Sequence, residues 1–245
     1  VLPGVSLAGG EYFYVNPLSS SGTDPAIGRK RIERMEWPWT PCCPPNVMRT
    51  LAVLDHFIAT TGENGLQIHQ FISSTLRLGL ENGRHVVLTM ESDFPWNGEV
   101  EITVDEMKQA GQGGSATETW PLMVRLPGWS TDAEITINGR HHDNLEIKSG
   151  YAVIHRAWQE GDTLRLAFPM QPNLLVSHPY IDETRDSCAL QRGPLLYCLE
   201  QVDQDETIDI KEVFIDELSP LTSRWDNDTL GGVVFIEAEG YRQNT

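Results

Sequence analysis

The sequence predicts a mostly β protein, with one clear helix near the amino terminus followed by antiparallel β-sandwich or jelly-roll domains. After Gly62 the chain is a succession of short runs of alternating apolar and polar residues divided by turn signals. Helical spacing of apolar residues is clear in one segment, from Val47 to Ile58. The 245 residues are 40% hydrophobic and 8% aromatic, which is typical of a globular chain that buries a core.

The predicted helix follows from apolar residues three and four positions apart. Val47, Leu51, Leu54 and Ile58 have this spacing, and Gly62 stands where a helix would stop. Residues 1–45 contain strand-like pieces and a polar loop, with little periodicity. We therefore expect residues 1–62 to form a separate, partly helical region.

The strands are predicted from alternation and from turn dipeptides. Runs such as LQIHQFIS and EVEITVD place apolar side chains on one face, and Asn82-Gly83 and Asn138-Gly139 suit tight hairpins with positive φ. Alternation weakens in the proline-containing stretch 168–180. The sequence thus predicts one β-sandwich over 63–170 and a second sandwich segment over 171–245.

Net charge limits the partners of the protein. The formal charge is −17 with acidic residues spread along the chain, which disfavours nucleic acid and an anionic membrane surface. Neutral or cationic ligands fit better. No apolar run of 18 residues and no basic signal region is visible, so the compartment stays open between cytoplasm and periplasm, with reducing conditions favoured by the cysteine pair.

Two adjacent cysteines form the most unusual motif. Cys42 and Cys43 lie between Pro41 and the pair Pro44-Pro45, where Pro44 biases Cys43 toward extended backbone. A helix start follows, and its N–H groups and dipole favour a thiolate, the form that attacks electrophiles and binds metals. The alternative, that both are small buried side chains, stays open.

The other two cysteines are assigned no chemistry. Cys188 and Cys198 lie among apolar residues in CALQRGPLLYC, so we expect thiols buried in the core.

Six motifs in order along the chain resemble those of glycoside hydrolase family 127, the β-L-arabinofuranosidase family. They are VLPGVSL, FYVNPL, CCPPN, FPWNGEVEITV, RLPGWS and ALQRGPLLYCLE. The resemblance implies an (α/α)6 barrel followed by β-sandwich domains, so that residues 1–62 would be the carboxy-terminal tail of the barrel domain and the sandwich segment 171–245 would be truncated. It also implies retaining hydrolysis of terminal β-L-arabinofuranosyl or related furanosyl units of a glycan or oligosaccharide, with zinc as cofactor.

The same resemblance assigns roles to three residues. Cys42 would be the nucleophile and a zinc ligand, Cys43 would be a second zinc ligand, and Tyr14 would line the sugar-binding site. In the family the remaining two zinc ligands and the general acid/base lie upstream, partly in an E-T-C motif that this chain does not contain. We therefore expect a carboxy-terminal portion of the enzyme that is inactive alone and has the upstream barrel segment as its partner.

Two other functions remain open. A non-catalytic carbohydrate-binding module would use exposed aromatic residues such as Trp96 or Trp129. A structural accessory module would brace another domain with its strands and have no site.

Overall fold

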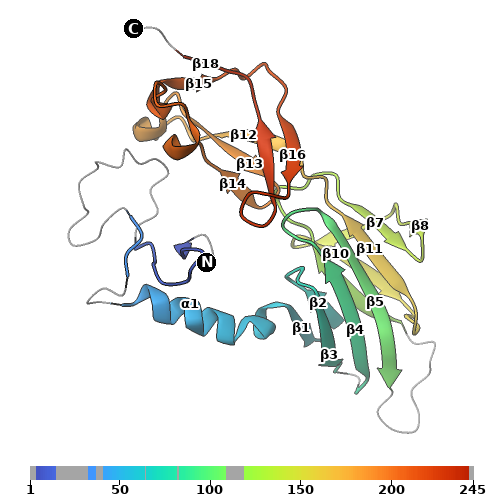
Figure 1. Cartoon of the computed structure of the whole chain (residues 1–245). Coiled ribbons are helices and arrows are strands. Elements are labelled where there is room, and N and C mark those ends of the chain that lie inside the picture. The colour runs from blue at the N-terminus through green and yellow to red at the C-terminus, as the bar shows by residue number, and fades with distance from the viewer. Residues whose placement is uncertain are drawn as a thin grey trace. The chain divides into compact units, whose positions relative to one another are not determined.

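The computed structural model describes residues 4–14, 33–36, 41–63, 65–81, 83–108 and 119–242. The chain forms two compact units, Val1–Ile58 and Ala59–Thr245. Most elements are β-strands, and the described residues contain a single α-helix, α1 (Figure 1). The predicted fold class, mostly β with one clear helix, is confirmed.

The first unit contains α1 and a short bridged segment. Tyr12 forms isolated antiparallel β-bridges with Val5 and with Met35. The second bridge joins residues 33–36 to residues 4–14. Helix α1 spans Cys43–Ala52 and is followed by the 3-10 helix η2, Leu54–Phe57.

The expected continuous helix from Val47 to Ile58 is wrong at both ends. The structure starts the helix at Cys43, because proline is well tolerated in the first turn, where no intrahelical N–H bond is lost. It ends the α-helix at the C-cap Val53, whose φ of −125° and ψ of 18° leave the helical region. Apolar spacing continues through η2 and so does not mark this break.

Two sheets make up the first part of the second unit. The five-stranded sheet has the order β1-β2-β6-β10-β9, with β1 Ala59–Gly62, β2 Gly65–Ile68, β6 Trp120–Arg125, β10 Tyr151–Arg156 and β9 Glu146–Lys148. The six-stranded sheet has the order β3-β4-β5-β11-β7-β8, with β3 Ser74–Gly79, β4 His85–Ser92, β5 Glu99–Lys108, β11 Thr163–Ala167, β7 Glu134–Ile137 and β8 Arg140–His141. Pairing is antiparallel except between β2 and β6, which are parallel.

The sandwich core comes from the alternation seen in the sequence. Every second residue is buried along Val86–Met90 of β4 and Val100–Val104 of β5, and β2 and β11 alternate in the same way. In β6 the three consecutive residues Leu122, Met123 and Val124 are buried. Leu88, Ile102, Leu122 and Leu164 are at most 1% exposed. Burying each such side chain stabilises the fold by about 1.5–3 kcal/mol, so this core can hold the sheets together.

The predicted hairpin turn at Asn138-Gly139 is confirmed. Asn138 and Gly139 have φ of 49° and 74°, as both residues of a type I′ hairpin require. Gly83 also has positive φ, at 78°, whereas Asn82 lies outside the described residues.

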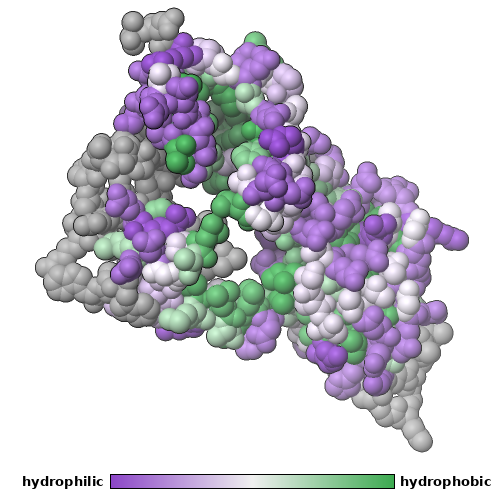
Figure 2. Space-filling model, in the orientation of Figure 1, coloured by the Kyte–Doolittle hydropathy of each residue, from purple (hydrophilic) through white to green (hydrophobic). Residues whose placement is uncertain are grey.

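The carboxy-terminal strands form three small sheets. They are β12 Pro172–Val176, β13 Cys188–Arg192 and β14 Leu195–Tyr197; β15 Val213–Ile215 with β18 Gly240–Arg242; and β16 Thr222–Asp226 with β17 Val233–Glu237. Three short 3-10 helices lie between them, η3 Asp182–Thr184, η4 Gln201–Asp203 and η5 Ile210–Glu212. Apolar residues reach the surface here, for example Val176 at 77% and Leu196 at 60% exposure (Figure 2).

This open packing corrects the expectation for two cysteines. Cys188 and Cys198 are both exposed free thiols rather than core residues. Their apolar neighbours lie in sheets too small to cover both faces, so an apolar sequence context did not mean burial. No helix in the described part of the chain combines the length and apolar character needed to cross a membrane.

Candidate active site

The cysteine pair lies at the start of α1. Cys42 is the N-cap residue, with φ of −74° and ψ of −33°, and Cys43 is the first helical residue. Their sulfur atoms are 3.7 Å apart. Cys42 is exposed and Cys43 is half-buried. The alternative that both thiols are buried does not describe Cys42, which is accessible to a ligand.

Asn46 fixes the backbone that carries the pair. Its N–H and its side-chain Nδ2 both donate to the carbonyl oxygen of Cys42, at 3.3 Å and 2.8 Å. Its Oδ1 accepts a hydrogen bond from Arg49 at 2.7 Å, and its carbonyl accepts one from the Thr50 hydroxyl at 2.8 Å. Sequence reasoning missed this positioning residue, although it is the last letter of the quoted CCPPN motif.

The structure corrects the argument from the helix N-terminus. Cys43 belongs to the helix although it precedes Pro44, so the extended backbone expected for it is not adopted. Pro44 and Pro45 occupy the next two helical positions and carry no N–H. The start of α1 therefore offers the thiols fewer backbone donors than an ordinary helix start.

Tyr14 lies within electrostatic range of both cysteines. Burial, followed by the neighbouring thiols of Cys43 and Cys42, raises the pKa of Tyr14 above its usual value. Its hydroxyl is buried and has no hydrogen-bond partner among the described residues. The phenol therefore stays protonated near neutral pH, with a proton available to donate. The structure thus brings together the three residues that the sequence motifs singled out.

A metal would find two ligands here. In the described ranges no three His, Cys, Asp or Glu side chains gather in a way that could hold an ion. The two adjacent thiols of Cys42 and Cys43 are candidate ligands for half of a four-ligand site, and the other half would have to come from elsewhere.

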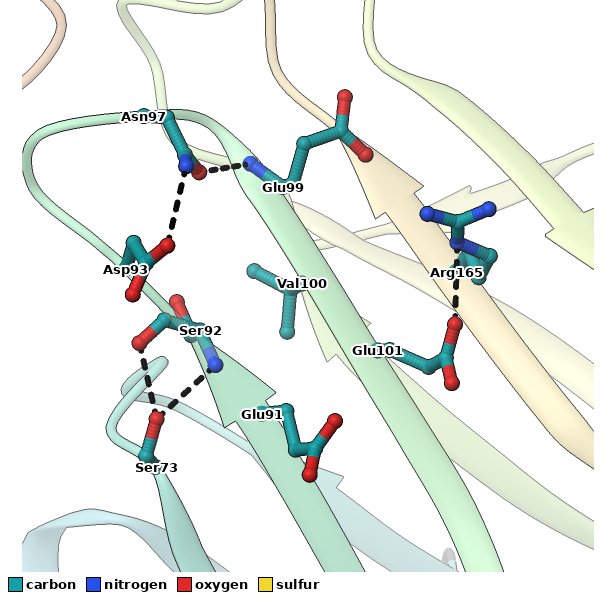
Figure 3. A pocket seen from close by; sticks show the side chains of 9 residues that line it. All are labelled: Ser73, Glu91, Ser92, Asp93, Asn97, Glu99, Val100, Glu101 and Arg165. Carbon is teal, nitrogen blue, oxygen red and sulfur yellow. Dashed lines mark hydrogen bonds and ion pairs between the residues drawn. The ribbon is translucent and has the colours of Figure 1, made fainter.

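An open groove lies on the six-stranded sheet of the second unit. This open groove of about 480 Å³ is lined by polar side chains at the ends of β4 and β5 and on β11 (Figure 3). Its lining residues are Ser73, Glu91, Ser92, Asp93, Asn97, Glu99, Val100, Glu101 and Arg165. No residue of this groove was a predicted site residue.

Comparison with known proteins covers most of the chain. The catalytic, middle and C-terminal domain models of the GH127 β-L-arabinofuranosidases match residues 1–56, 65–170 and 172–232. A non-reducing end β-L-arabinofuranosidase of Bifidobacterium longum subsp. longum is 34% identical over 212 residues, which are 82% of this chain and 30% of that protein.

Solved structures give the same result. A GH127 β-L-arabinofuranosidase from Geobacillus stearothermophilus T6 superposes with a TM-score of 0.86 at 35% identity, over 98% of this chain and 36% of that one. Another glycoside hydrolase has a TM-score of 0.86 at 30% identity, over all of this chain and 39% of that one. The chain thus spans between 30% and 39% of the length of these relatives. In sequence and in fold, it belongs to glycoside hydrolase family 127.

Proposed function

We propose that this chain supplies the nucleophile of a retaining glycoside hydrolase that releases terminal β-L-arabinofuranosyl, or related furanosyl, units from a glycan. The observation that carries the proposal is the pair of thiols at the start of α1, with one of them exposed and with Tyr14 close by. The relatives named as β-L-arabinofuranosidases support the substrate class.

The spacing of the two sulfur atoms fits zinc. Two thiolates that share a tetrahedral zinc ion, each about 2.3 Å from it, lie about 3.8 Å apart. The sulfur atoms of Cys42 and Cys43 are 3.7 Å apart. When bound, zinc would keep both thiols deprotonated at neutral pH.

Cys42 is the better placed nucleophile because it is the exposed member of the pair. Its sulfur forms a bond to the anomeric carbon while the bond from that carbon to the leaving oxygen breaks, and a carboxylic acid gives the leaving oxygen its proton. Water then attacks the same carbon, gives a proton to the resulting carboxylate and releases the sulfur. Two displacements at one carbon retain its configuration.

Tyr14 would bind the sugar in this mechanism. Its protonated hydroxyl lacks a hydrogen-bond partner in the described part of the chain. Because it is buried, it would donate to a sugar oxygen once the side chains that cover it move aside on binding. The acid that protonates the leaving group would come from an upstream segment, as the resemblance implies. We therefore propose that the 245-residue chain is inactive by itself.

Covalent labelling tests the nucleophile. A protein extended upstream to the length of the relatives is treated with a furanoside that carries an electrophile, such as a haloacetamide, and the labelled residue is identified by mass spectrometry. We expect the label on Cys42 and none in Cys42→Ala. A label on an aspartate or glutamate would refute the assignment.

Metal content tests the ligand pair. Cys43→Ser should lower the zinc content of the extended protein, because a hydroxyl is a poor ligand for a soft metal. Cys188→Ser is the matched control, since Cys188 is an exposed thiol in the other unit. Equal zinc in Cys43→Ser and in the control would exclude Cys43 as a ligand.

An activity assay tests the need for an upstream acid. On an aryl β-L-arabinofuranoside, with zinc and reductant present, the 245-residue chain should be at least about 100-fold slower than the extended protein, since general acid catalysis contributes about 100- to 10,000-fold. Equal turnover would show that the acid lies within residues 1–245.

A further inference from the structure

Two half-exposed tryptophans meet at the surface of the second unit. Trp96 lies in the loop between β4 and β5, and Trp225 lies on β16. Their rings pack edge to face, with centroids 6.2 Å apart and planes at 72°. Trp96 is 38% exposed and Trp225 is 47% exposed. Large aromatic side chains are usually buried more completely, so this pair leaves considerable apolar surface in contact with water.

Hydrogen bonds hold the loop of Trp96 in place. The N–H of Trp96 donates to the carbonyl of Asp93 at 2.9 Å, and its own carbonyl accepts a bond from Arg192 Nη1 at 3.0 Å. Arg192 lies on β13, so this contact joins the loop to the carboxy-terminal strands. The position of Trp96 is therefore fixed by backbone contacts that do not involve its ring.

Trp225 is held as firmly. Its Nε1 donates to Oδ1 of Asn227 at 2.7 Å. One side of the indole packs over Gly232, where a Cβ atom would come within 2.5 Å of Cζ2. Gly232 also has φ of +121°, which side chains rarely allow. A ring fixed in this way loses little conformational entropy on binding a ligand.

The loop that carries Trp96 also carries polar side chains. Asp93 and Asn97, on either side of Trp96 in the chain, both line the open groove on the six-stranded sheet, and Figure 3 shows them close together with Glu99. The Asn97 amide is already engaged, since its Nδ2 donates to Asp93 Oδ2 at 3.4 Å and its Oδ1 accepts from the N–H of Glu99 at 2.9 Å. The Asp93 carboxylate has further lone pairs that can accept a hydrogen bond from a hydroxyl group. Five side chains of the groove are charged, four of them acidic, which disfavours an anionic ligand.

We propose that Trp96 and Trp225 form a platform that binds a neutral oligosaccharide. The C–H groups on one face of a sugar ring carry partial positive charge and pack on the negative face of an indole. The hydroxyls of the sugar reach polar groups beside the indole. The Asp93 carboxylate would accept hydrogen bonds from those hydroxyls, with Asn97 holding it in place at 3.4 Å. Trp96 and Trp225 belong to the second unit and the cysteine pair belongs to the first, so binding at the platform is tested independently of the proposed hydrolysis.

Isothermal titration of the 245-residue chain tests the platform. The probes are neutral arabino-, xylo- and gluco-oligosaccharides, with an oligogalacturonate as the anionic comparison. We expect at least one neutral oligosaccharide to bind and the anionic one not to bind. Trp96→Ala and Trp225→Ala should each weaken binding by about 2- to 12-fold, if a stacked sugar contributes as much as the second ring of an aromatic pair.

Two further variants separate stacking from folding. Trp225→Phe keeps an aromatic face and should retain most of the affinity, whereas Gly232→Ala displaces the indole and should weaken binding. Tyr180→Ala is the control, since Tyr180 is an aromatic residue that is 90% exposed elsewhere in the same unit. Circular dichroism confirms that each variant is folded. Absence of binding by all neutral probes, or unchanged affinity in both alanine variants, would overturn the proposal.

Discussion

Replacing Asp162 with alanine should destabilise the β-sandwich strongly, because this carboxylate joins three segments. It is 7% exposed and directly precedes β11. It accepts hydrogen bonds from Asn138 Nδ2 at 2.6 Å, from Arg156 Nε and Nη2 at 3.1 Å and 3.2 Å, and from the N–H of Gln159 at 2.9 Å. Alanine would leave these donors without their acceptor.

The expected loss follows from how deeply each partner is buried. Removing one member of a buried ion pair costs about 3–5 kcal/mol. The Arg156 side chain is 40% exposed, so water replaces part of its lost contact. We therefore expect a loss of about 2–4 kcal/mol, which for a chain of this size lowers Tm by about 5–15 °C.

An exposed ion pair supplies the control. Glu101 and Arg165 lie 3.1 Å apart, with side chains 41% and 58% exposed, so Glu101→Gln should cost no more than about 1 kcal/mol. Urea unfolding followed by circular dichroism at pH 7 compares the two variants. If Asp162→Ala lost no more stability than Glu101→Gln, the carboxylate would not hold the sandwich together.

The same contact predicts a dependence on pH. Burial alone would raise the pKa of Asp162, but hydrogen bonds from Arg156, Asn138 and the N–H of Gln159 outweigh it and lower the pKa. A lowered pKa means that the stabilisation is complete above about pH 4, the value in the unfolded chain, and is lost as pH falls through the folded value. The stability difference between wild type and Asp162→Asn should therefore shrink on acidification, and a constant difference down to about pH 2 would contradict this account.

Three other outcomes are expected. Burial, followed by the charge of Arg125, lowers the pKa of His69. The stability that depends on its neutral ring should therefore be present above about pH 6.5 and decrease as the pH falls further. Urea unfolding should show a smaller decrease over this pH range in His69→Gln. Gly98→Ala should cost at least about 1–3 kcal/mol in the same assay, because a Cβ atom there would lie 1.9 Å from the carbonyl oxygen of Phe168. Although the Cys198 residue is exposed, partial desolvation of its thiol, followed by the charges of Glu200 and Asp203, raises the pKa of Cys198. Iodoacetamide should therefore modify it more slowly at pH 7 than it modifies free cysteine.

Alternation predicted the strands of the sandwich because it reports which face of a strand is buried. It does not report which strand is the neighbour, so the parallel pairing of β2 with β6 was not predicted. The Asn138-Gly139 turn was predictable, since its two residues are those that accept positive φ. The break after Ala52 was not, because apolar spacing continues through η2.

The candidate site was predictable only in part. The adjacency of Cys42 and Cys43 is evident in the sequence, whereas their proximity to Tyr14 followed from the resemblance to a family and not from spacing or periodicity. The Trp96–Trp225 contact was missed because its members lie far apart in the sequence, Trp96 in the loop after β4 and Trp225 on β16. The feature that marks Trp225 as a fixed ring is its close approach to Gly232, and this approach is apparent only in the structure.

The residues that stabilise the fold and those proposed for chemistry lie in different units. The sandwich has a complete core of its own, as the burial of Leu88 and Leu164 shows. The cysteines lie on a helix of 10 residues, a length that is marginal in isolation, and its Met48 and Leu51 are 54% and 51% exposed. The hydrogen bonds of Asn46 to the Cys42 carbonyl are the local contacts that fix the backbone of the thiols. A short sequence motif identifies the thiols because local contacts position them. Alternation over many strands is needed to identify the sandwich, because its core comes from residues far apart in the sequence.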